Sequence, residues 1–198
     1  MMIIKSNLVW AALYVSSLEN KKHEGLLNSL HITEKYIEST NGFACVRMEH
    51  GAVVEGNLDI TLRFLAPIPT NAEYTEFTLN KTLKVIHFDE HNAIIGTSEV
   101  VVTEQRYPNI DSVIPTTQCE RVPIVDPEML ALPYTLFGDV AVVIRILPSS
   151  ESTAIGFEFD EYVKEEYGNP SLFIMPRFPE TFDAVKKRVE EKRKELTQ

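Results

Sequence analysis

The sequence predicts an α+β fold built from repeated units, each a helix or turn followed by adjacent antiparallel strands. Apolar residues recur at helical spacing in only a few short segments. Segments rich in Val and Ile, several with alternating polarity, occupy much of the rest. Turn signals containing Gly, Asn, Asp or Pro separate these segments. The same order of elements occurs three times, which indicates structural repetition without visible sequence identity.

The first unit is predicted to open with a helix over residues 7–20, preceded by Ser6 or Asn7 as the N-cap. One face of this helix carries the apolar residues Leu8, Ala11, Ala12, Val15 and Leu18. A strand is expected over 27–37 and a second over 42–48, joined at the hairpin turn signal Asn41-Gly42. The first unit is therefore one helix followed by a hairpin.

The second unit has prolines where the first has a helix. Residues 58–65 alternate as a strand does, and Pro67 and Pro69 interrupt the segment that follows. We therefore expect no more than a short turn of helix over 70–77. Further strands are expected at 82–88, 93–95 and 99–103, with a turn over 89–92.

The third unit returns to the order of helix and then strands. After a short strand over 121–125, Asp126 and Pro127 are typical of a helix start, and the helix over 129–137 is expected to bend at Pro133. Strands are expected over 140–147, 153–159 and 171–175, and the acidic residues between 160 and 166 are expected in a loop. Past Pro179, a last exposed helix with mixed charges is predicted.

Composition indicates a folded protein with a core, because 44% of the 198 residues are hydrophobic and 24% are charged. The net charge of −10 disfavours nucleic acid, so any DNA contact would need a local basic patch. Cys45 and Cys119 lie far apart and lack the spacing of a metal site. We therefore expect both to be free thiols in a reducing compartment. The apolar run near the start is far shorter than the ~20 residues of a membrane span. We expect a cytoplasmic protein without a membrane partner.

The sequence lacks the motifs that usually carry chemistry. It contains no GxSxG, GxxxxGK or GxGxxG, and its five histidines are scattered. The nearest pair, His87 and His91, lies on a predicted strand and its turn, and no helical ligand pair results. We therefore expect no enzyme activity, no catalytic residue, no cofactor and no metal. A small α+β enzyme with an unrecognised site is the remaining alternative.

Three short strings stand out at strand ends. Ser39-Thr40-Asn41-Gly42 lies between two predicted strands, Tyr107-Pro108-Asn109-Ile110 precedes Val113-Ile114-Pro115, and Ile174-Met175-Pro176-Arg177 closes a strand. In the same order they resemble the "ATDG" turn, the "FPDY..VLP" exit and the terminal "VMPMR" of the bacterial DNA polymerase III beta subunit, the beta sliding clamp. The resemblance covers about residues 5–178 and suggests a truncated or divergent member, encoded by a mobile element.

The resemblance implies about one and a half clamp domains: a clamp-like domain over 1–116, a half domain over 117–178 and a charged helix over 179–198. It also implies a non-enzymatic replication accessory protein that docks peptides of replication proteins in a hydrophobic pocket. Such a protein could assemble around double-stranded DNA, non-specifically and as a homo-oligomer. The alternative is a clamp-fold adaptor or decoy that binds replication proteins without encircling DNA.

Carried over by motif, the partner pocket would use residues of all three strings, with Met129 on the third-unit helix as a looser candidate. The residues are Thr40, Gly42, Pro108, Val113, Phe173, Met175 and Pro176. Weak DNA contacts would come from Lys21, Lys22, Lys186, Lys187 and Arg188. Simpler explanations stay open: buried Phe, Met and Val usually serve core packing, and basic residues at a helix end complement its dipole.

Overall fold

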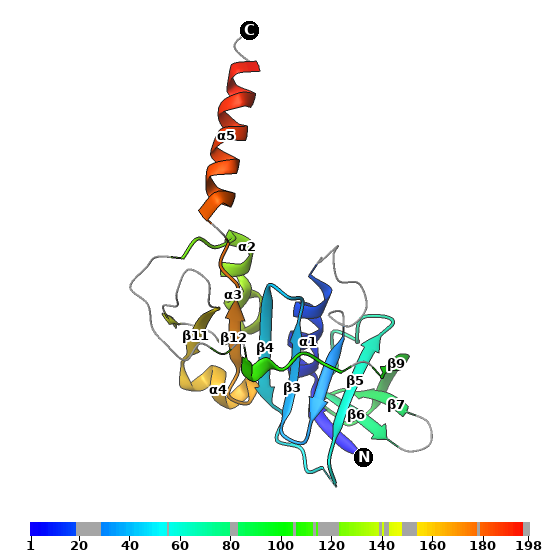
Figure 1. The fold of residues 1–198 in the computed structure, drawn as a ribbon. Coiled ribbons are helices and arrows are strands. Elements are labelled where there is room, and N and C mark those ends of the chain that lie inside the picture. Colours follow the sequence, from blue (N-terminus) through cyan, green and yellow to red (C-terminus); the bar gives the residue numbers. More distant parts are fainter. Residues whose placement is uncertain are drawn as a thin grey trace.

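A computed structural model describes residues 1–18, 29–54, 56–79, 83–104, 106–112, 114, 123–138, 140, 143–147, 154–177 and 179–195. Within these ranges the strands form two sheets, one of four strands and one of eight (Figure 1). Every pairing between named strands is antiparallel. The predicted α+β class with antiparallel strands is confirmed.

The small sheet has the order β1-β6-β7-β8. Its strands are β1 (Met2–Lys5), β6 (Tyr74–Leu79), β7 (Leu83–Phe88) and β8 (Ile94–Ser98). The large sheet has the order β10-β11-β12-β4-β3-β2-β5-β9. Its strands are β10 (Ile144–Leu147), β11 (Ile155–Phe159), β12 (Ser171–Ile174), β4 (Ala44–Glu49), β3 (Tyr36–Thr40), β2 (Leu30–Thr33), β5 (Asp59–Phe64) and β9 (Val100–Thr103).

The pairing of β4 with β12 joins the first unit to the third. Cys45 lies opposite Phe173 in this pair, although the two residues are far apart in the sequence. The strands of the two units therefore share one continuous sheet, and the turn after β3 lies beside the end of β12.

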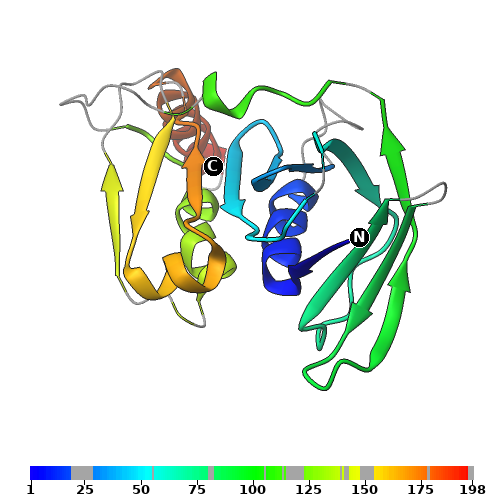
Figure 2. The ribbon, with the colours of Figure 1, turned by 90° about the horizontal axis from the view of Figure 1, so that it is seen from below.

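Helix α1 (Ser6–Ser17) packs on one face of the large sheet, against β3 and β4 (Figure 2). Its inward side buries Leu8, Val9, Ala12 and Val15 in the main core. The predicted first helix is confirmed, and it begins at Ser6 and ends at Ser17. The expected N-cap at Ser6 or Asn7 is wrong, because Lys5 is the N-cap and its side chain makes no capping hydrogen bond. No residue of α1 is charged.

The prediction of one strand over 27–37 is wrong, because the chain turns at Glu34 and Lys35 and forms two strands, β2 and β3. Ile32 pairs with Ile37 across this turn. The short turn of helix expected over 70–77 is also wrong, since β6 occupies Tyr74–Leu79. Pairing with both β1 and β7 satisfies the backbone of β6, a tertiary effect that the local sequence does not reveal.

The third unit contains the predicted helix start at Asp126, whose side chain accepts a hydrogen bond from Glu128 N at 3.1 Å. The helix is interrupted at Ala131, so that α2 (Pro127–Leu130) and α3 (Leu132–Phe137) follow each other, with Pro133 in the first turn of α3. The bend expected at Pro133 is therefore present as a break.

The acidic stretch expected as a loop is a helix, α4 (Glu161–Tyr167). Asp160 caps it by accepting hydrogen bonds from Tyr162 N and Val163 N. Gly168 ends it at a φ of 61°, and any side chain there would run into the Glu49 carbonyl. Early acidic residues favour a helix N-terminus, which explains why the charge pattern misled the prediction.

Helix α5 (Pro179–Glu195) leads away from the two sheets, as predicted for an exposed last helix (Figure 1). Lys186, Lys187 and Arg188 are exposed on it. None of the described helices is both long and apolar enough to cross a membrane.

No helix occurs in the second unit within residues 56–79, where Pro67 and Pro69 lie. A groove of about 500 Å³ runs between this segment and the outer side of α1, bordered by Trp10, Tyr14 and Leu65. Within the described residues, no helix packs against α1 on the side of this segment.

Candidate functional site: an apolar groove under a strap

An apolar groove of about 190 Å³ lies where β4 and β12 pair. Three segments that are far apart in the sequence line it: the turn between β3 and β4, the chain that follows β9, and the strands β11 and β12 with their flanking residues. Its lining residues are Thr40, Gly42, Phe43, Ala44, Cys45, Pro108, Asn109, Ile110, Ala154, Phe173, Ile174 and Met175.

The turn between β3 and β4 forms a rim held by its own hydrogen bonds. Thr40 Oγ1 donates to the Ala44 carbonyl at 2.7 Å and accepts from Gly42 N at 3.1 Å. Asn41 Oδ1 accepts from the amides of Phe43 and Ala44. Gly42 has a φ of 85°, a conformation that strongly favours glycine. The predicted hairpin turn is confirmed, and its side chains are committed to the turn itself.

Residues 106–112, which we call the strap, cross the face of the large sheet opposite α1 (Figures 1 and 2). The strap ends in a single 3₁₀ turn, Ile110–Ser112. Two residues of the strap, Tyr107 and Ile110, are buried against the sheet. They form a small apolar cluster with Cys45, Ala154 and Phe173. The strap therefore covers a second, minor core and provides one wall of the groove.

The opposite wall comes from the end of β12. Phe173 packs over Gly156 of β11, where an added Cβ would approach the ring to 3.3 Å. Met175 is 36% exposed, and its backbone N–H donates to the Phe43 carbonyl at 2.6 Å. The Arg177 guanidinium lies over the Phe43 ring at 5.0 Å. This wall combines a fixed aromatic ring with a flexible, accessible thioether side chain.

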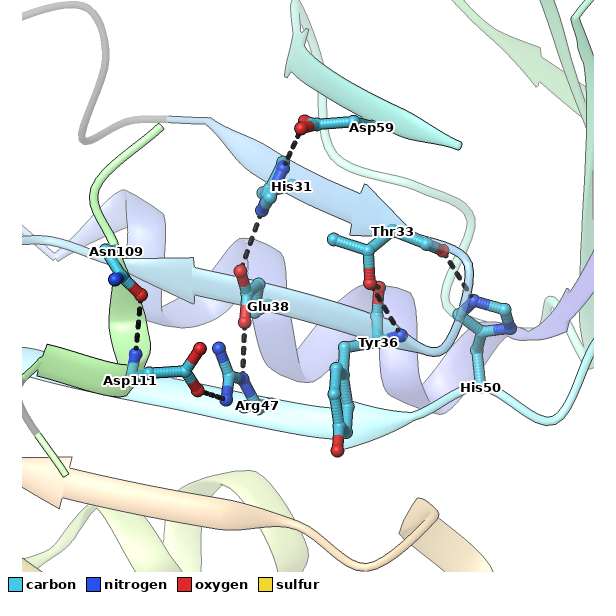
Figure 3. Close-up of polar contacts among 9 residues, drawn as sticks. All are labelled: His31, Thr33, Tyr36, Glu38, Arg47, His50, Asp59, Asn109 and Asp111. Carbon is cyan, nitrogen blue, oxygen red and sulfur yellow. Dashed lines mark hydrogen bonds and ion pairs between the residues drawn. The ribbon is translucent and has the colours of Figure 1, made fainter. Parts of the chain in front are cut away.

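A chain of charged side chains runs across β2, β3 and β4 on the strap side of the sheet (Figure 3). His31 Nδ1 lies 2.7 Å from Glu38 Oε1, and Arg47 Nε donates to Glu38 Oε2 at 2.6 Å. Arg47 Nη1 donates to Asp111 Oδ1 of the strap at 2.5 Å. The chain of contacts therefore leads from the sheet to the wall of the groove.

Both ring nitrogens of His31 face carboxylates, since Nε2 lies 2.8 Å from Asp59 Oδ1. An ionised carboxylate only accepts hydrogen bonds, so this geometry favours a doubly protonated imidazolium ring. Burial lowers the pKa of His31, but the hydrogen bonds and charges of Glu38 and Asp59 outweigh it and raise the pKa above its ordinary value. Tyr107 stacks on this ring with centroids 4.5 Å apart.

The only described cysteine, Cys45, lies in the floor of the groove and is not set up as a nucleophile. Burial raises the pKa of its thiol to about 12, so the reactive thiolate is scarce at neutral pH. Among the described residues no group of three His, Cys, Asp or Glu side chains could hold a metal ion. What the groove offers is apolar contact and fixed backbone polar groups.

Five residues predicted from the three strings lie together in the groove: Thr40, Gly42, Pro108, Phe173 and Met175. Pro176 follows directly but does not line it, and Met129 is buried in the main core on α2. Val113, Lys21 and Lys22 lie outside the described residues. Lys186, Lys187 and Arg188 are exposed on α5, and none of the α1 residues Ser6–Ser17 is basic.

Sequence reasoning missed the residues that support the groove. Phe43, which directly follows the first string, and Ala154, which precedes β11 and belongs to no string, line it, as does Ile110 at the end of the second string. His31, Glu38 and Arg47 were also missed. Their sequence signal is a titratable residue inside a strand, which becomes specific once the three strands are known to be neighbours.

Two solved structures identify the class of fold as that of a DNA sliding clamp. DNA polymerase III subunit beta from Borrelia burgdorferi, solved in complex with a natural product, matches with a TM-score of 0.60 at 14% identity, over 89% of this chain and 64% of that chain. The beta chain from Streptococcus pneumoniae TIGR4 matches with a TM-score of 0.56 at 10% identity, over 88% and 64%.

The chain therefore has the sliding-clamp fold and spans less than two thirds of the length of these two neighbours. Neither the models of known protein families nor the curated protein sequences yield a significant match to it. The likeness inferred from three short strings is confirmed at the level of the fold.

Proposed function

We propose that this protein is a non-enzymatic accessory of DNA replication that binds short peptide segments of replication proteins in the groove. The observation that supports this best is the meeting of five residues from three distant segments in one apolar groove. Each string alone is a weak signal, but the fold brings them to a single site. The sliding-clamp fold supplies the link to replication.

The groove suits a peptide that inserts one or two apolar side chains. Phe173 and Met175 provide aromatic and adaptable sulfur surfaces, and Gly42 and the strap border the same space. Buried apolar anchors of this kind carry most of the binding free energy in peptide recognition. The volume of about 190 Å³ limits the ligand to a short anchor, with the rest of the peptide lying across the surface.

The adaptor alternative, in which DNA is not encircled, is favoured by α1. Phosphate binding depends on Lys and Arg side chains, and α1 contains neither. The outer side of α1 instead carries the stacked rings of Trp10 and Tyr14, whose centroids are 5.3 Å apart. The net charge of −10 also disfavours DNA binding, because it repels the phosphate backbone. We therefore propose peptide binding as the main activity, with DNA retention as the property to be tested against it.

The test is fluorescence anisotropy with a labelled peptide containing Gln-Leu-Asp-Leu-Phe. We expect micromolar binding by the protein and at least a tenfold loss with Met175→Ala, because the accessible side chain of Met175 contacts the anchor. Ile146→Ala is the matched control: Ile146 is also an accessible apolar residue on a strand of the same sheet, but it lies outside the groove.

Absence of binding at ~100 μM, which corresponds to about −5.5 kcal/mol or weaker, would contradict the peptide-binding proposal. A parallel measurement of DNA retention at low salt separates the two forms of it. Retention of duplex DNA by the full chain would favour the encircling form, and peptide binding without retention would favour the adaptor.

A further inference from the structure

The strap is the wall of the groove with the fewest backbone constraints. It follows β9 and belongs to no sheet, and its 3₁₀ turn is held internally by Asn109, whose carbonyl accepts from Ser112 N and Ser112 Oγ. Asn109 Oδ1 also accepts from Asp111 N at 3.0 Å. These local bonds fix the shape of the turn but not its distance from the sheet.

Besides the apolar cluster beneath it, the strap is tied to the sheet by two polar or aromatic side-chain contacts. The first is the ion pair of Arg47 with Asp111. The Arg47 side chain is only 13% exposed and is held from two sides, by Glu38 through Nε and by the Tyr36 ring, which lies 4.8 Å from the guanidinium. A guanidinium fixed in this way presents its remaining N–H groups in one direction, toward Asp111.

The second contact is the stack of Tyr107 on His31. The two rings are nearly parallel, with an angle of 19° between them. The His31 ring cannot turn freely, because Glu38 and Asp59 hold its two nitrogens. Tyr107 is the first buried residue of the strap and packs beside Ile110, which lines the groove. Glu38 is common to both contacts, since it binds Arg47 as well as His31.

We propose that Arg47 and His31 are positioning residues for the groove: by holding Asp111 and Tyr107 they set the distance between the strap and β12, and thereby the affinity of the groove for its peptide. This inference rests on the proposed peptide binding and assigns its regulation to residues that do not touch the ligand. Neither Arg47 nor His31 lines the groove. Any change that weakens the ion pair with Asp111 widens the groove and weakens binding.

The test uses Asp111→Asn, because Asp111 is exposed and its substitution leaves both cores unchanged. Its control is Glu158→Gln, which removes another Arg–carboxylate pair of similar length, Arg145 with Glu158 at 2.6 Å, from strands β10 and β11. We expect the peptide dissociation constant to rise about tenfold in Asp111→Asn, equivalent to about 1.4 kcal/mol, and to change less than about twofold in Glu158→Gln.

A second readout does not need the peptide. Hydrogen exchange of the segment over residues 106–112 is expected to accelerate in Asp111→Asn but not in Glu158→Gln, while exchange in β12 and the midpoint of thermal unfolding stay close to those of the parent protein. Arg47→Lys is expected to behave like Asp111→Asn, because an ammonium group cannot bridge Glu38 and Asp111 as the guanidinium does.

The two readouts separate this inference from the proposed function. If the parent protein binds no peptide, the function fails, and hydrogen exchange still decides whether Arg47 and Asp111 hold the strap. If Asp111→Asn leaves both peptide affinity and strap exchange at the level of Glu158→Gln, the positioning role is overturned. A loss of affinity that is matched by a lower unfolding midpoint would also overturn it, since the ion pair would then serve only global stability.

Discussion

Two buried histidines, one in each sheet, have opposite environments. His31 in the large sheet lies between two carboxylates, Glu38 and Asp59. His87 in the small sheet lies between two hydroxyls: its Nδ1 is 3.0 Å from Thr75 Oγ1 and its Nε2 is 2.7 Å from Ser98 Oγ. Both rings have two polar partners and are largely hidden from water.

The difference shows that the chemistry of the partners, more than burial, decides the charge of a buried imidazole. A hydroxyl can donate or accept, so a neutral ring satisfies both partners of His87, and burial lowers its pKa. Ionised carboxylates only accept, so Glu38 and Asp59 favour the protonated ring and raise the pKa of His31. The same residue type therefore favours the neutral form in one sheet and the protonated form in the other.

The largest effect is expected from Glu38→Ala. This substitution removes the acceptor shared by His31 and Arg47 and leaves two cations close together with little access to water. Loss of one partner from a buried ion pair costs about 3–5 kcal/mol, and we expect a decrease of that size in the free energy of unfolding. Denaturant unfolding at pH 7 measures it. A decrease below about 1 kcal/mol would show that water screens the ion pairs of Glu38. The environments of His31 and His87 would then differ less than their burial indicates.

A smaller effect, caused by His31, is expected in the free energy of unfolding at alkaline pH. Because the folded-state pKa of His31 lies above the ordinary value of about 6.5, its stabilisation is complete below that pH and is lost as the pH rises through the folded-state pKa. The slope for one such group is at most about 1.4 kcal/mol per pH unit. Unfolding in urea at pH 6 and pH 8.5 should show this loss in the parent protein and not in His31→Gln. An equal loss in both proteins would rule out His31 as its source.

The opposite slope is expected from His87. Its folded-state pKa is lowered by burial, so the unfolded chain takes up the proton first, and stability falls as the pH drops below about 6.5. His50, whose pKa burial also lowers, adds to this slope despite the hydrogen bond between its Nε2 and the Thr33 carbonyl. We therefore expect His87→Gln to reduce the acid slope between pH 6.5 and 5 without removing it. An unchanged slope would mean that His87 carries a proton in the folded protein.

The smallest effect is expected from Glu158→Gln. Arg145 and Glu158 form an ion pair as short as those around Glu38, but the Arg145 side chain is 75% exposed. Exposed pairs contribute about 0–1 kcal/mol, so a change within about 0.5 kcal/mol is expected by denaturant unfolding, with the largest value at low salt. A loss comparable to that of Glu38→Ala would show that distance, and not burial, sets the strength of these pairs.

Local chemistry explains which parts of the fold were predictable. The spacing of Leu8, Ala12 and Val15 identified α1, and Asn41-Gly42 identified the hairpin turn, because both patterns act within a few residues. The strand β6 and the helix α4 were misjudged. The strand β6 is stabilised by neighbours on both sides, and the acidic residues of α4 fit a helix start as well as a loop.

The candidate site divides in the same way. The sequence by itself determined the turn, the proline-marked strap and the end of β12, since each depends on Gly, Pro or an alternating pattern. Only the tertiary structure decided that these three segments meet, because the pairing of β4 with β12 is a contact between distant parts of the chain. It also decided that Met129 belongs to the core and that His31, Glu38 and Arg47 form one network. Free energies of such long-range contacts depend on which strands become neighbours, and no local pattern records that choice.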